Sequence, residues 1–484
     1  MKETRRLTCS PDSPTDQTQL GSLYRALASP AAAVPSAFCR ALQMNSRFTS
    51  TRSYRRFRSR RRPHSLRTVR TRTQRSSPQG FFEKLPAEVF DFILDYLSAD
   101  DASVFSMASK TISGCIMRRV STSAWRNQMI AQWFHCTSAE AEGSALDHFR
   151  RLGLLFKRCT LLLPTKDRLR FSYSVFSQVP CLAMDQCAAF PLCRGFVYYG
   201  VFLTTLIAGW DELECRRVFD FMCENTNLQR SIEAAVTCRP GACHRLELVV
   251  RLFCRGVLLN QWQRRRDSFF WLMCILRPWP IVSQARLLFI LFGPLQSDGK
   301  IGWQRVHDQV VGQGGLWDLA KAIILLHDHK ETRGWRPDTV LSIMDEMMVM
   351  PLPWYSENIA RLLILCGKNI CYNVLASKAI NGRFSEISRI LIFLILVSEK
   401  DGYCMKWAVK MTQQVCQVFS VASEKWSFVQ SVENMFSEVT MELYELVMAG
   451  NHNEDVDPLQ HLCCLLNASA HFHTEIVYMS LRKD

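Results

Sequence analysis

The clearest alternation of apolar and polar positions lies in residues 81–120. Apolar side chains recur every four residues from position 85 to position 97, and two neighbours widen this stripe into one broad face: Leu85, Val89, Phe90, Ile93, Leu94 and Leu97. That period is typical of an amphipathic helix. Pro86 stands where a first-turn proline is tolerated, and Glu88 stands near the positive end of the helix dipole. The pattern therefore predicts a helix across these positions.

Two shorter helices are predicted directly after this one. Residues 98–101, Ser-Ala-Asp-Asp, interrupt the stripe with residues that favour a helix N-cap. The next two helices would carry the following apolar positions, which are Val104, Phe105, Ala108, Ile112, Ile116 and Val120. Three short helices bury too little surface to be stable alone. They are therefore either a subdomain that docks on its own chain or a module that offers a spare apolar face to another protein.

From Trp125 onward the helical period continues almost to the end of the chain, and strand patterns are nearly absent. The aromatic-rich stretch 125–134 is expected to pack the first three helices against a helical body over 121–484. Within that body the pattern predicts one helix over 246–262. At the end it predicts a helix over 423–449, a polar break near 451–457, and two separate helices over 459–466 and 472–481.

Two similar segments within the chain give information about the architecture of the body. Residues 285–293 and 360–367 both begin Ala-Arg-Leu-Leu, lie 75 residues apart, and follow clusters of Pro and Trp. Arg251 lies 35 residues before Arg286. These spacings are close to one and two units of ~37 residues, as in helical-pair repeats of the HEAT or armadillo kind. The fold is therefore predicted to be all-α, with the body either an irregular α-solenoid or a compact multi-helical domain without true repeats.

Residues 85–101 resemble the first half of an F-box, a short helical motif that binds the adaptor Skp1. They contain Leu-Pro-x-Glu, then Ile-Leu-x-Tyr-Leu at the offset that the family uses, then an Asp. The second half departs from the family pattern at Ala102, Phe105, Ala108 and Ile112, where Leu, Leu, Val and Trp are usual. The resemblance implies a three-helix F-box over 81–120. It also implies that the groove of Skp1 is contacted by Leu85, Pro86, Glu88, Val89, Ile93, Leu94 and Leu97.

The resemblance implies a function as well. Proteins of this family act as non-catalytic subunits of Skp1–cullin–F-box E3 ubiquitin ligases, so we expect Skp1 and, through it, a cullin as partners. The helical body would then recruit a protein substrate, whose identity the sequence does not give. The alternative is a Skp1-bound scaffold that works without degradation in a nuclear or chromosome-associated assembly.

The net charge of +15 changes how the first residues are interpreted. Residues 1–80 carry 17 basic and 3 acidic side chains, whereas the remaining 404 residues carry 42 and 41. Residues 1–79 are also rich in Ser, Thr and Pro and lack apolar periodicity, so they are predicted to be a disordered tail. The body is nearly neutral, and we expect a nucleic-acid contact only through this tail.

Twelve arginines and no acidic residue lie within 47–75, most densely at Arg55, Arg56, Arg58, Arg60, Arg61 and Arg62. Three interpretations remain open: a solvated tail, a segment for nuclear import or polyanion contact, and a mitochondrial presequence. The third is weakened by three acidic residues within the first sixteen positions. We expect the nucleus as the location of the protein, with a cytoplasmic pool allowed.

The twenty cysteines contain no C-x-x-C pair, and no apolar segment follows the first six residues. This favours free thiols in a reducing compartment and gives no sign of a secretory signal. Residues 195–210 are sixteen positions without a charge, which is shorter than the ~20 residues that a membrane span needs. They are predicted to be a core helix, and no contact with a membrane is expected.

Motifs that would indicate a catalytic site are absent from the sequence. There is no phosphate-binding glycine loop, no H-E-x-x-H and no G-x-S-x-G. Two clusters have metal-ligand residue types. One is Cys238, Cys243 and His244, and the other is His461, Cys463, Cys464, His471 and His473. Zinc could take four of the second set, but core thiols and surface imidazoles explain them equally well. No catalytic residue, metal or cofactor is therefore predicted.

Overall fold

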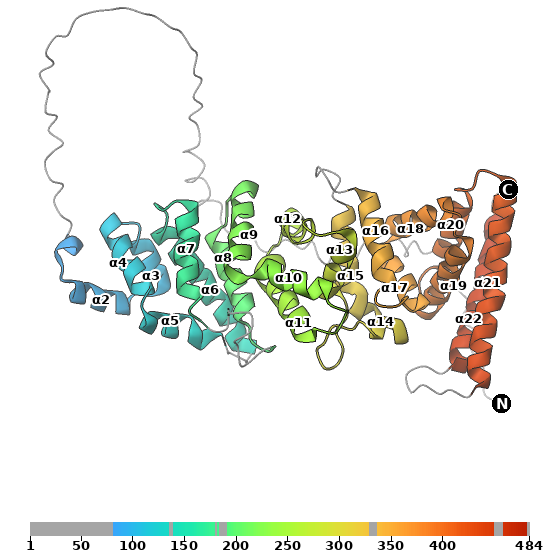
Figure 1. The fold of residues 1–484 in the computed structure, drawn as a ribbon, viewed down its shortest axis with the longest axis horizontal. Helices are drawn as coiled ribbons and strands as arrows, with labels where there is room; N and C mark the ends of the chain where they lie inside the picture. Colours follow the sequence, from blue (N-terminus) through green and yellow to red (C-terminus); the bar gives the residue numbers. More distant parts are fainter. Residues whose placement is uncertain are drawn as a thin grey trace, which may run out of the picture. The chain divides into compact units, whose positions relative to one another are not determined.

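The computed structural model describes residues 81–134, 139–179, 182, 191–328, 336–449 and 458–481. This part of the chain is built from helices (Figure 1), and its one β feature is an isolated antiparallel bridge between Leu295 and Ile301. The prediction of an all-α fold is confirmed. The predictions for the tail at 1–79, its arginine cluster and the break at 451–457 lie outside the described residues.

The three predicted helices of the first module are present. A 3-10 turn, η2 (Phe81–Lys84), precedes α2 (Ala87–Tyr96), α3 (Ala99–Phe105) and α4 (Lys110–Val120). Helix α2 begins two residues later than predicted, because Pro86 has an extended backbone with ψ at 147°. The side chain of Ser98 accepts a hydrogen bond from the backbone N–H of Asp101 at 3.2 Å and so caps α3. Ser109 caps α4 in the same way through Ile112 at 3.2 Å.

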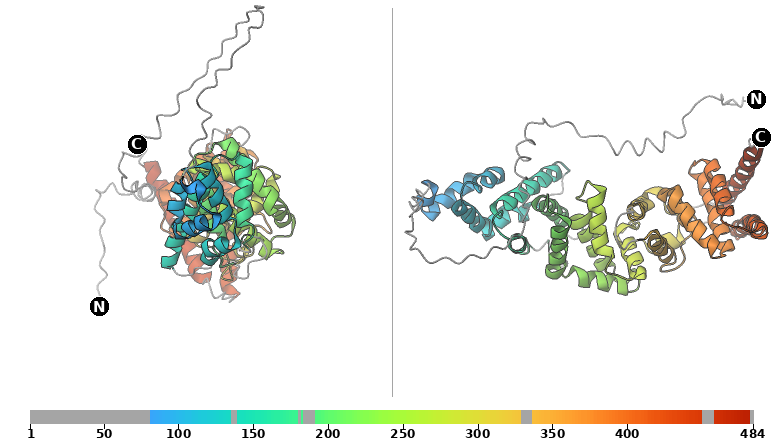
Figure 2. Two further views of the ribbon diagram at one scale, coloured as in Figure 1. Left: turned by 90° about the vertical axis from the view of Figure 1, so that its left-hand side faces the viewer. Right: turned by 90° about the horizontal axis from the view of Figure 1, so that it is seen from above.

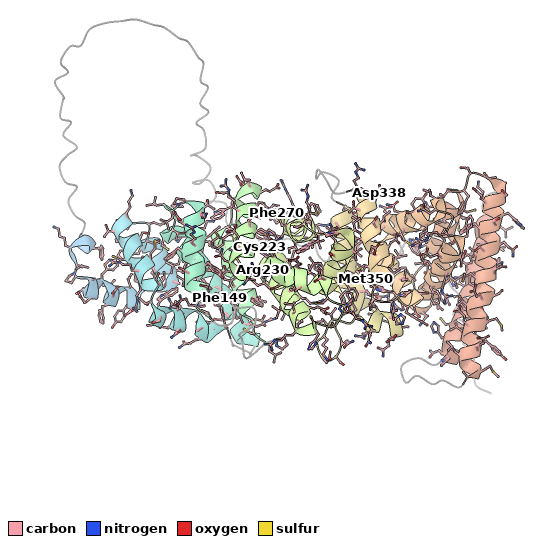
Figure 3. The ribbon with its side chains drawn as sticks, in the orientation of Figure 1. Phe149, Cys223, Arg230, Phe270, Asp338 and Met350 are labelled. Carbon is pink, nitrogen blue, oxygen red and sulfur yellow. The ribbon has the colours of Figure 1, made fainter. Side chains whose placement is uncertain are left out.

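The next segment joins this module to the body. It contains α5 (Ser123–Met129), η3 (Ala131–Trp133), α6 (Ala139–Cys159), α7 (Thr165–Phe176) and α8 (Gly195–Leu206). Helix α6 packs against α3 and α4 on one side and α8 on the other. The ring of Phe149 on α6, labelled in Figure 3, lies 5.4 Å from that of Phe134 and stacks on Tyr198 of α8 at 5.2 Å. The aromatic stretch 125–134 therefore packs on the body, as predicted.

Helix α8 lies within the hydrophobic core, as its apolar sequence predicts. Nine of its residues are buried, including Tyr198, Phe202 and Leu206, which are fully enclosed. None of the described helices is both long enough and apolar enough to cross a bilayer.

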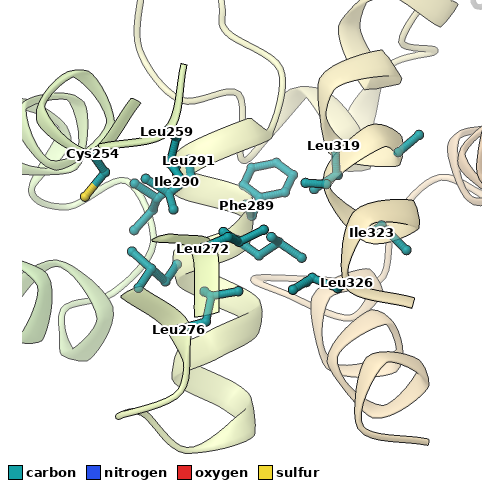
Figure 4. Packing of buried hydrophobic residues seen from close by; sticks show 14 of the residues in the cluster. Cys254, Leu259, Leu272, Leu276, Phe289, Ile290, Leu291, Leu319, Ile323 and Leu326 are labelled. Atoms are coloured by element: carbon teal, nitrogen blue, oxygen red, sulfur yellow. The ribbon is translucent and has the colours of Figure 1, made fainter. Parts of the chain in front are cut away.

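The centre of the body consists of shorter helices. They are α9 (Glu212–Thr226), α10 (Leu228–Thr237), α11 (His244–Phe253), its π-helical continuation η5 (Cys254–Leu259), α12 (Arg265–Leu276), α13 (Ile281–Phe292) and α14 (Arg305–Asp308). Leucine side chains of α12 and α13 face α15 (Gln313–His327) around the fully buried ring of Phe289 (Figure 4). This apolar contact continues the core from one layer of helices into the next.

The C-terminal half is a regular stack of helical pairs (Figures 1 and 2). After α15 it contains α16 (Pro337–Met348), α17 (Ser356–Cys366), α18 (Lys368–Ile380), α19 (Phe384–Lys400), α20 (Met405–Cys416), α21 (Ala422–Met448) and α22 (Pro458–Leu481). Helices α15, α17, α19 and α21 pack in one row, and α18, α20 and α22 pack in a second. Of the two predicted architectures, the α-solenoid is therefore the correct one.

The stack explains why the two similar segments share an arginine. Arg286 lies on α13 and Arg361 lies on α17, two layers further along the same row. Arg361 is 4% exposed and donates to the backbone carbonyl of Val311 at 3.0 Å. Arg286 donates to the carbonyl of Val236 at 2.8 Å, and Arg251 donates to that of Gly293 at 2.8 Å. Each repeated arginine therefore satisfies a backbone carbonyl that belongs to a different element.

Three local predictions differ from the structure. The two predicted C-terminal helices are one helix, α22, because Leu465, Ala468 and Phe472 continue its buried stripe across the polar stretch between them. The predicted helix over 246–262 changes from α to π winding at Cys254. Helix α18 was not predicted as a separate element, since only Gly367 separates it from α17.

Candidate functional site

The first module leaves five large apolar side chains exposed on α2 and at the end of α3. The exposed fractions are 45% for Val89, 60% for Phe92, 76% for Tyr96, 58% for Val104 and 56% for Met107. The first three have the spacing of one helix face on α2. The rings of Phe92 and Tyr96 meet edge to face with centroids 5.0 Å apart. These five residues are called the α2–α3 apolar surface below, and they are the strongest candidate for a protein-docking site.

The opposite side of α2 packs against other helices of the same chain. Phe90 is 4% exposed and stacks on Phe105 of α3 at 5.9 Å. Leu94 is 8% exposed and lines a small cavity together with Trp125 and Leu155. Helix α2 thus has a buried face that holds it in place and a second face that remains open.

The structure distributes the predicted Skp1-contacting residues over both faces. Pro86, Glu88 and Val89 are exposed, whereas Leu85, Ile93 and Leu97 are half-buried. Leu94 is the exception, because it points into the module and supports α2 from inside. The prediction omitted four exposed residues, which are Phe92, Tyr96, Val104 and Met107. The positions of Phe92 and Tyr96, three and seven residues after Val89, are the sequence signal that identifies them.

Polar contacts fix the module on α6. The guanidinium of Arg158 donates to the hydroxyl of Ser103 at 3.0 Å, and the hydroxyl of Ser113 donates to the carbonyl of Cys159 at 2.6 Å. Arg119 on α4 also forms an ion pair with Asp95 on α2. Because these contacts join α3 and α4 to α6 and α2 to α4, the α2–α3 apolar surface is presented on a rigid base.

The two clusters with metal-ligand residue types form no shared site in the described ranges, although Cys238 and Cys243 are hydrogen-bonded to each other. Each of the three histidines contacts a different carboxylate: His461 lies 3.3 Å from Glu357, His471 lies 2.9 Å from Glu399, and His473 lies 3.0 Å from Glu433. Within the described ranges, no three His, Cys, Asp or Glu side chains are placed to hold a metal ion. The zinc interpretation of both clusters therefore has no support in their geometry.

The cysteines that the structure describes are free thiols. Burial raises the pKa of the Cys159 thiol to about 12, and it raises that of Cys223 to about 12 as well. Thiols with such pKa values stay protonated at neutral pH and are poor nucleophiles. These two cysteines therefore contribute to packing.

A buried ionic cluster joins the last layers of the body. The carboxylate of Glu357 on α17 is fully buried and accepts hydrogen bonds from Arg361 at 3.1 Å and from Lys400 at 2.9 Å. Arg361 also donates to Asp401 at 2.9 Å. Burial alone would raise the pKa of Glu357, but the contact with His461 and the charge of Lys400 outweigh it and lower the pKa to about 2. The cluster is structural, because it ties α17, α19 and α22 together.

Comparisons with known proteins agree with this architecture. A family model described as FBXO47, ARM repeats, matches residues 224–461. F-box only protein 47 from Homo sapiens is 48% identical over 406 residues, which cover 83% of this chain and 90% of the human protein. F-box only protein 47 from Mus musculus is 48% identical over 418 residues, which cover 86% and 92% of the two chains. No solved structure gives a significant match.

Proposed function

This chain belongs to the F-box only protein 47 family, and from that membership we propose that it is the substrate-recognition subunit of a Skp1–cullin–F-box E3 ubiquitin ligase. In this role the F-box helices α2–α4 bind Skp1, and the helical body recruits a protein substrate. Ubiquitin transfer is carried out by other subunits, so the contribution of this chain to the reaction is to hold the substrate close to them.

The observation that carries the proposal is the α2–α3 apolar surface. It contains one residue implied by the F-box resemblance, Val89, together with Phe92 and Tyr96, which are more exposed. Burying apolar surface contributes roughly 25 cal/mol per Å² before the cost of association is subtracted. Large aromatic side chains are also the residues that most often dominate binding at protein interfaces. We therefore assign Skp1 binding to this surface, with Leu85, Pro86, Glu88, Ile93 and Leu97 at its edges.

The body supports the second half of the proposal. Stacked helical pairs give long continuous surfaces that are typical of proteins which bind other proteins. The proposed protein substrate would be held on such a surface, at a distance from Skp1 that the layers between them determine.

The proposal is tested by co-purification of Skp1 with the variant Val89→Asp, Tyr96→Asp. We expect this variant to lose Skp1 and to keep its helical circular dichroism, because both side chains are exposed and two charges would be buried at the interface. The matched control is Val282→Asp, Tyr444→Asp, whose side chains are 44% and 47% exposed outside the F-box. The control should retain Skp1.

Retention of Skp1 by the Val89→Asp, Tyr96→Asp variant would show that the adaptor binds elsewhere. The same purification also separates the two functional roles. A ligase subunit brings a cullin along with Skp1, whereas a Skp1-bound scaffold that acts without degradation yields Skp1 alone.

A further inference from the structure

A groove of about 370 Å³ lies far from the F-box, where α21 packs beside the first turn of α19. One wall is Ser385 of α19. The other is a row on α21 formed by Trp426, Gln430, Asn434 and Glu438. These four residues are called the α21 row below. Nothing in the F-box assignment uses them.

The α21 row faces solvent along its whole length. Its members are four residues apart, so they form one line along the helix with a step of about 6 Å. All four are exposed, and Trp426 is 70% exposed. The floor beneath them is closed, because Met435 is buried and Ser431 bonds to Ser388 of α19 at 2.9 Å. The row is therefore a surface feature, although the charge of Glu438 also acts on Arg389 of α19.

The two amides at the centre of the row have unused hydrogen-bonding groups. The side-chain nitrogen of Gln430 donates to the side-chain oxygen of Asn434 at 3.0 Å. Among the described residues, neither the oxygen of Gln430 nor the nitrogen of Asn434 has a hydrogen-bond partner. Together they present an acceptor and a donor, which is the pair of groups that a peptide unit requires.

The spacing of the row fits an extended polypeptide. Alternate residues of an extended strand are about 6.6 Å apart, which is close to the step of about 6 Å between members of the row. A strand that runs along α21 would therefore meet one member at every second residue. Small molecules usually bind in enclosed, mostly apolar cavities, whereas this groove is open and polar.

The negative charge of α21 indicates which side chains a bound segment would carry. Helix α21 carries five Glu and one Lys. In the part of the chain that the structure describes, Arg389 forms its ion pair with the neighbouring Glu442 at 2.8 Å and acts on Glu438 only through its charge, so the carboxylate of Glu438 forms no direct ion pair. Glu438 would attract a Lys or Arg of the bound segment, and the exposed ring of Trp426 would cover an apolar or basic side chain at the other end.

We propose that the groove between α19 and α21 binds an extended segment of a partner protein, with a basic residue opposite Glu438 and backbone hydrogen bonds to Gln430 and Asn434. In the ubiquitin-ligase role this segment belongs to the substrate. That identification rests on the proposed function, whereas the binding of the segment does not.

The test starts from a phage-displayed library of eight-residue peptides selected on the full-length chain. Enriched peptides should carry Lys or Arg at one fixed position and bind in fluorescence polarisation. The variant Gln430→Ala, Asn434→Ala should weaken their binding at least tenfold, and methylation of alternate backbone nitrogens should weaken it similarly. The control Gln413→Ala, Gln417→Ala removes two exposed amides with the same spacing at the C-terminal end of α20 and should leave binding unchanged.

The variant Glu438→Gln should remove the preference for a basic residue and flatten the dependence of binding on salt. The proposal is overturned if no peptide is enriched, if the enriched peptides are acidic, or if they bind the Gln430→Ala, Asn434→Ala variant as tightly as the native chain. Its failure is distinct from failure of the Skp1 assignment. The Val89→Asp, Tyr96→Asp variant should still bind the peptides, and the Gln430→Ala, Asn434→Ala variant should still bind Skp1.

Discussion

At the scale of single residues, the carboxylate of Glu357 connects three helices of the body. Its carboxylate is fully buried and contacts two cations, Arg361 on its own helix and Lys400 on α19, and it lies 3.3 Å from the imidazole of His461 on α22. Removing one partner of a buried ion pair leaves the remaining charges without compensation. The stability of the last layers should therefore be sensitive to this one residue.

We expect Glu357→Gln to cost about 3 kcal/mol of unfolding free energy, because the charges of Lys400 and Arg361 would lose a buried partner. The measurement is urea unfolding followed by circular dichroism at pH 7. The control is Glu212→Gln, which breaks the ion pair with Arg266, where both side chains are more than half exposed. An exposed pair contributes under about 1 kcal/mol. Equal losses in the two variants would contradict a structural role for the cluster.

The contribution of Glu357 to stability should also depend on pH. The pKa of Glu357 is lowered from 4.5 to about 2 in the folded chain. Its ionised form therefore stabilises the fold fully above pH 4.5, and this contribution is lost as the pH falls toward 2. Glutamine does not titrate, so the difference in stability between the native chain and Glu357→Gln should shrink over that interval. A difference that stays constant on acidification would assign the loss to packing instead.

At the scale of elements, α8 and η5 approach each other closely at two glycines. A Cβ atom on Gly200 of α8 would lie 2.1 Å from the carbonyl oxygen of Gly256, which belongs to the π-helical segment η5. No side chain fits at that distance, and the obstructing atom belongs to the backbone. The change from α to π winding in η5 occurs at this crossing.

We expect Gly200→Ala to destabilise the chain by several degrees of melting temperature, because α8 and η5 must separate to admit the methyl group. The control is Gly114→Ala on the exposed side of α4, where an added Cβ meets nothing within 4 Å. A Gly to Ala change in an open helix position stabilises by roughly 0.5–1 kcal/mol. The two variants should therefore shift the melting temperature in opposite directions. A neutral Gly200→Ala would mean that α8 can move freely.

The elements differ in how far their sequence determines them. Helices α2, α3 and α4 were predictable because their apolar period and the N-cap residues that begin at Ser98 are local signals. The continuity of α22 was not, since a polar stretch within a helix resembles a break unless its buried face is known. The π winding of η5 lies at a close contact with α8, more than fifty residues earlier in the chain, and the sequence pattern did not predict it.

The same limit applies to the candidate sites. The resemblance located the F-box, and periodicity placed Val89 on a helix face, but only tertiary packing decides that Leu94 points inward while Phe92 and Tyr96 stay open. The cluster around Glu357 was not predicted, because His461 lies 104 residues further along the chain. The four-residue spacing of the α21 row is present in the sequence, but the exposure of its side chains depends on how α21 packs on α19.

At the scale of the whole molecule, the two proposed docking surfaces are separated by the stacked layers of the body. The α2–α3 apolar surface precedes α6, and the α21 row follows α19, with the intervening helices packed in sequence order. Apolar contacts such as those around Phe289 link successive layers, so the stack acts as a spacer between the two surfaces. A substrate segment bound at α21 would therefore be held away from Skp1 at a distance that the number of layers sets.

The charge of the whole chain supports a last proposal, which concerns its location. We propose that the arginines within 47–75 direct the protein to the nucleus, because a dense basic run without acidic residues is the pattern of an import signal. Deleting 47–75 from a fluorescent fusion should shift the protein to the cytoplasm. Deleting 10–38 removes the same number of residues but one arginine instead of twelve, and it should leave the protein in the nucleus.

A second variant tests whether charge carries the signal. Replacing Arg55, Arg56, Arg58, Arg60, Arg61 and Arg62 by Lys keeps the charge of the densest cluster, whereas replacing them by Ser removes six positive charges. Import receptors recognise basic side chains largely through electrostatic attraction, so the Lys variant should remain nuclear and the Ser variant should not. Unchanged localisation of the Ser variant and of the 47–75 deletion would contradict the import proposal. Mitochondrial fluorescence of the native fusion would instead favour the presequence interpretation of the same arginines.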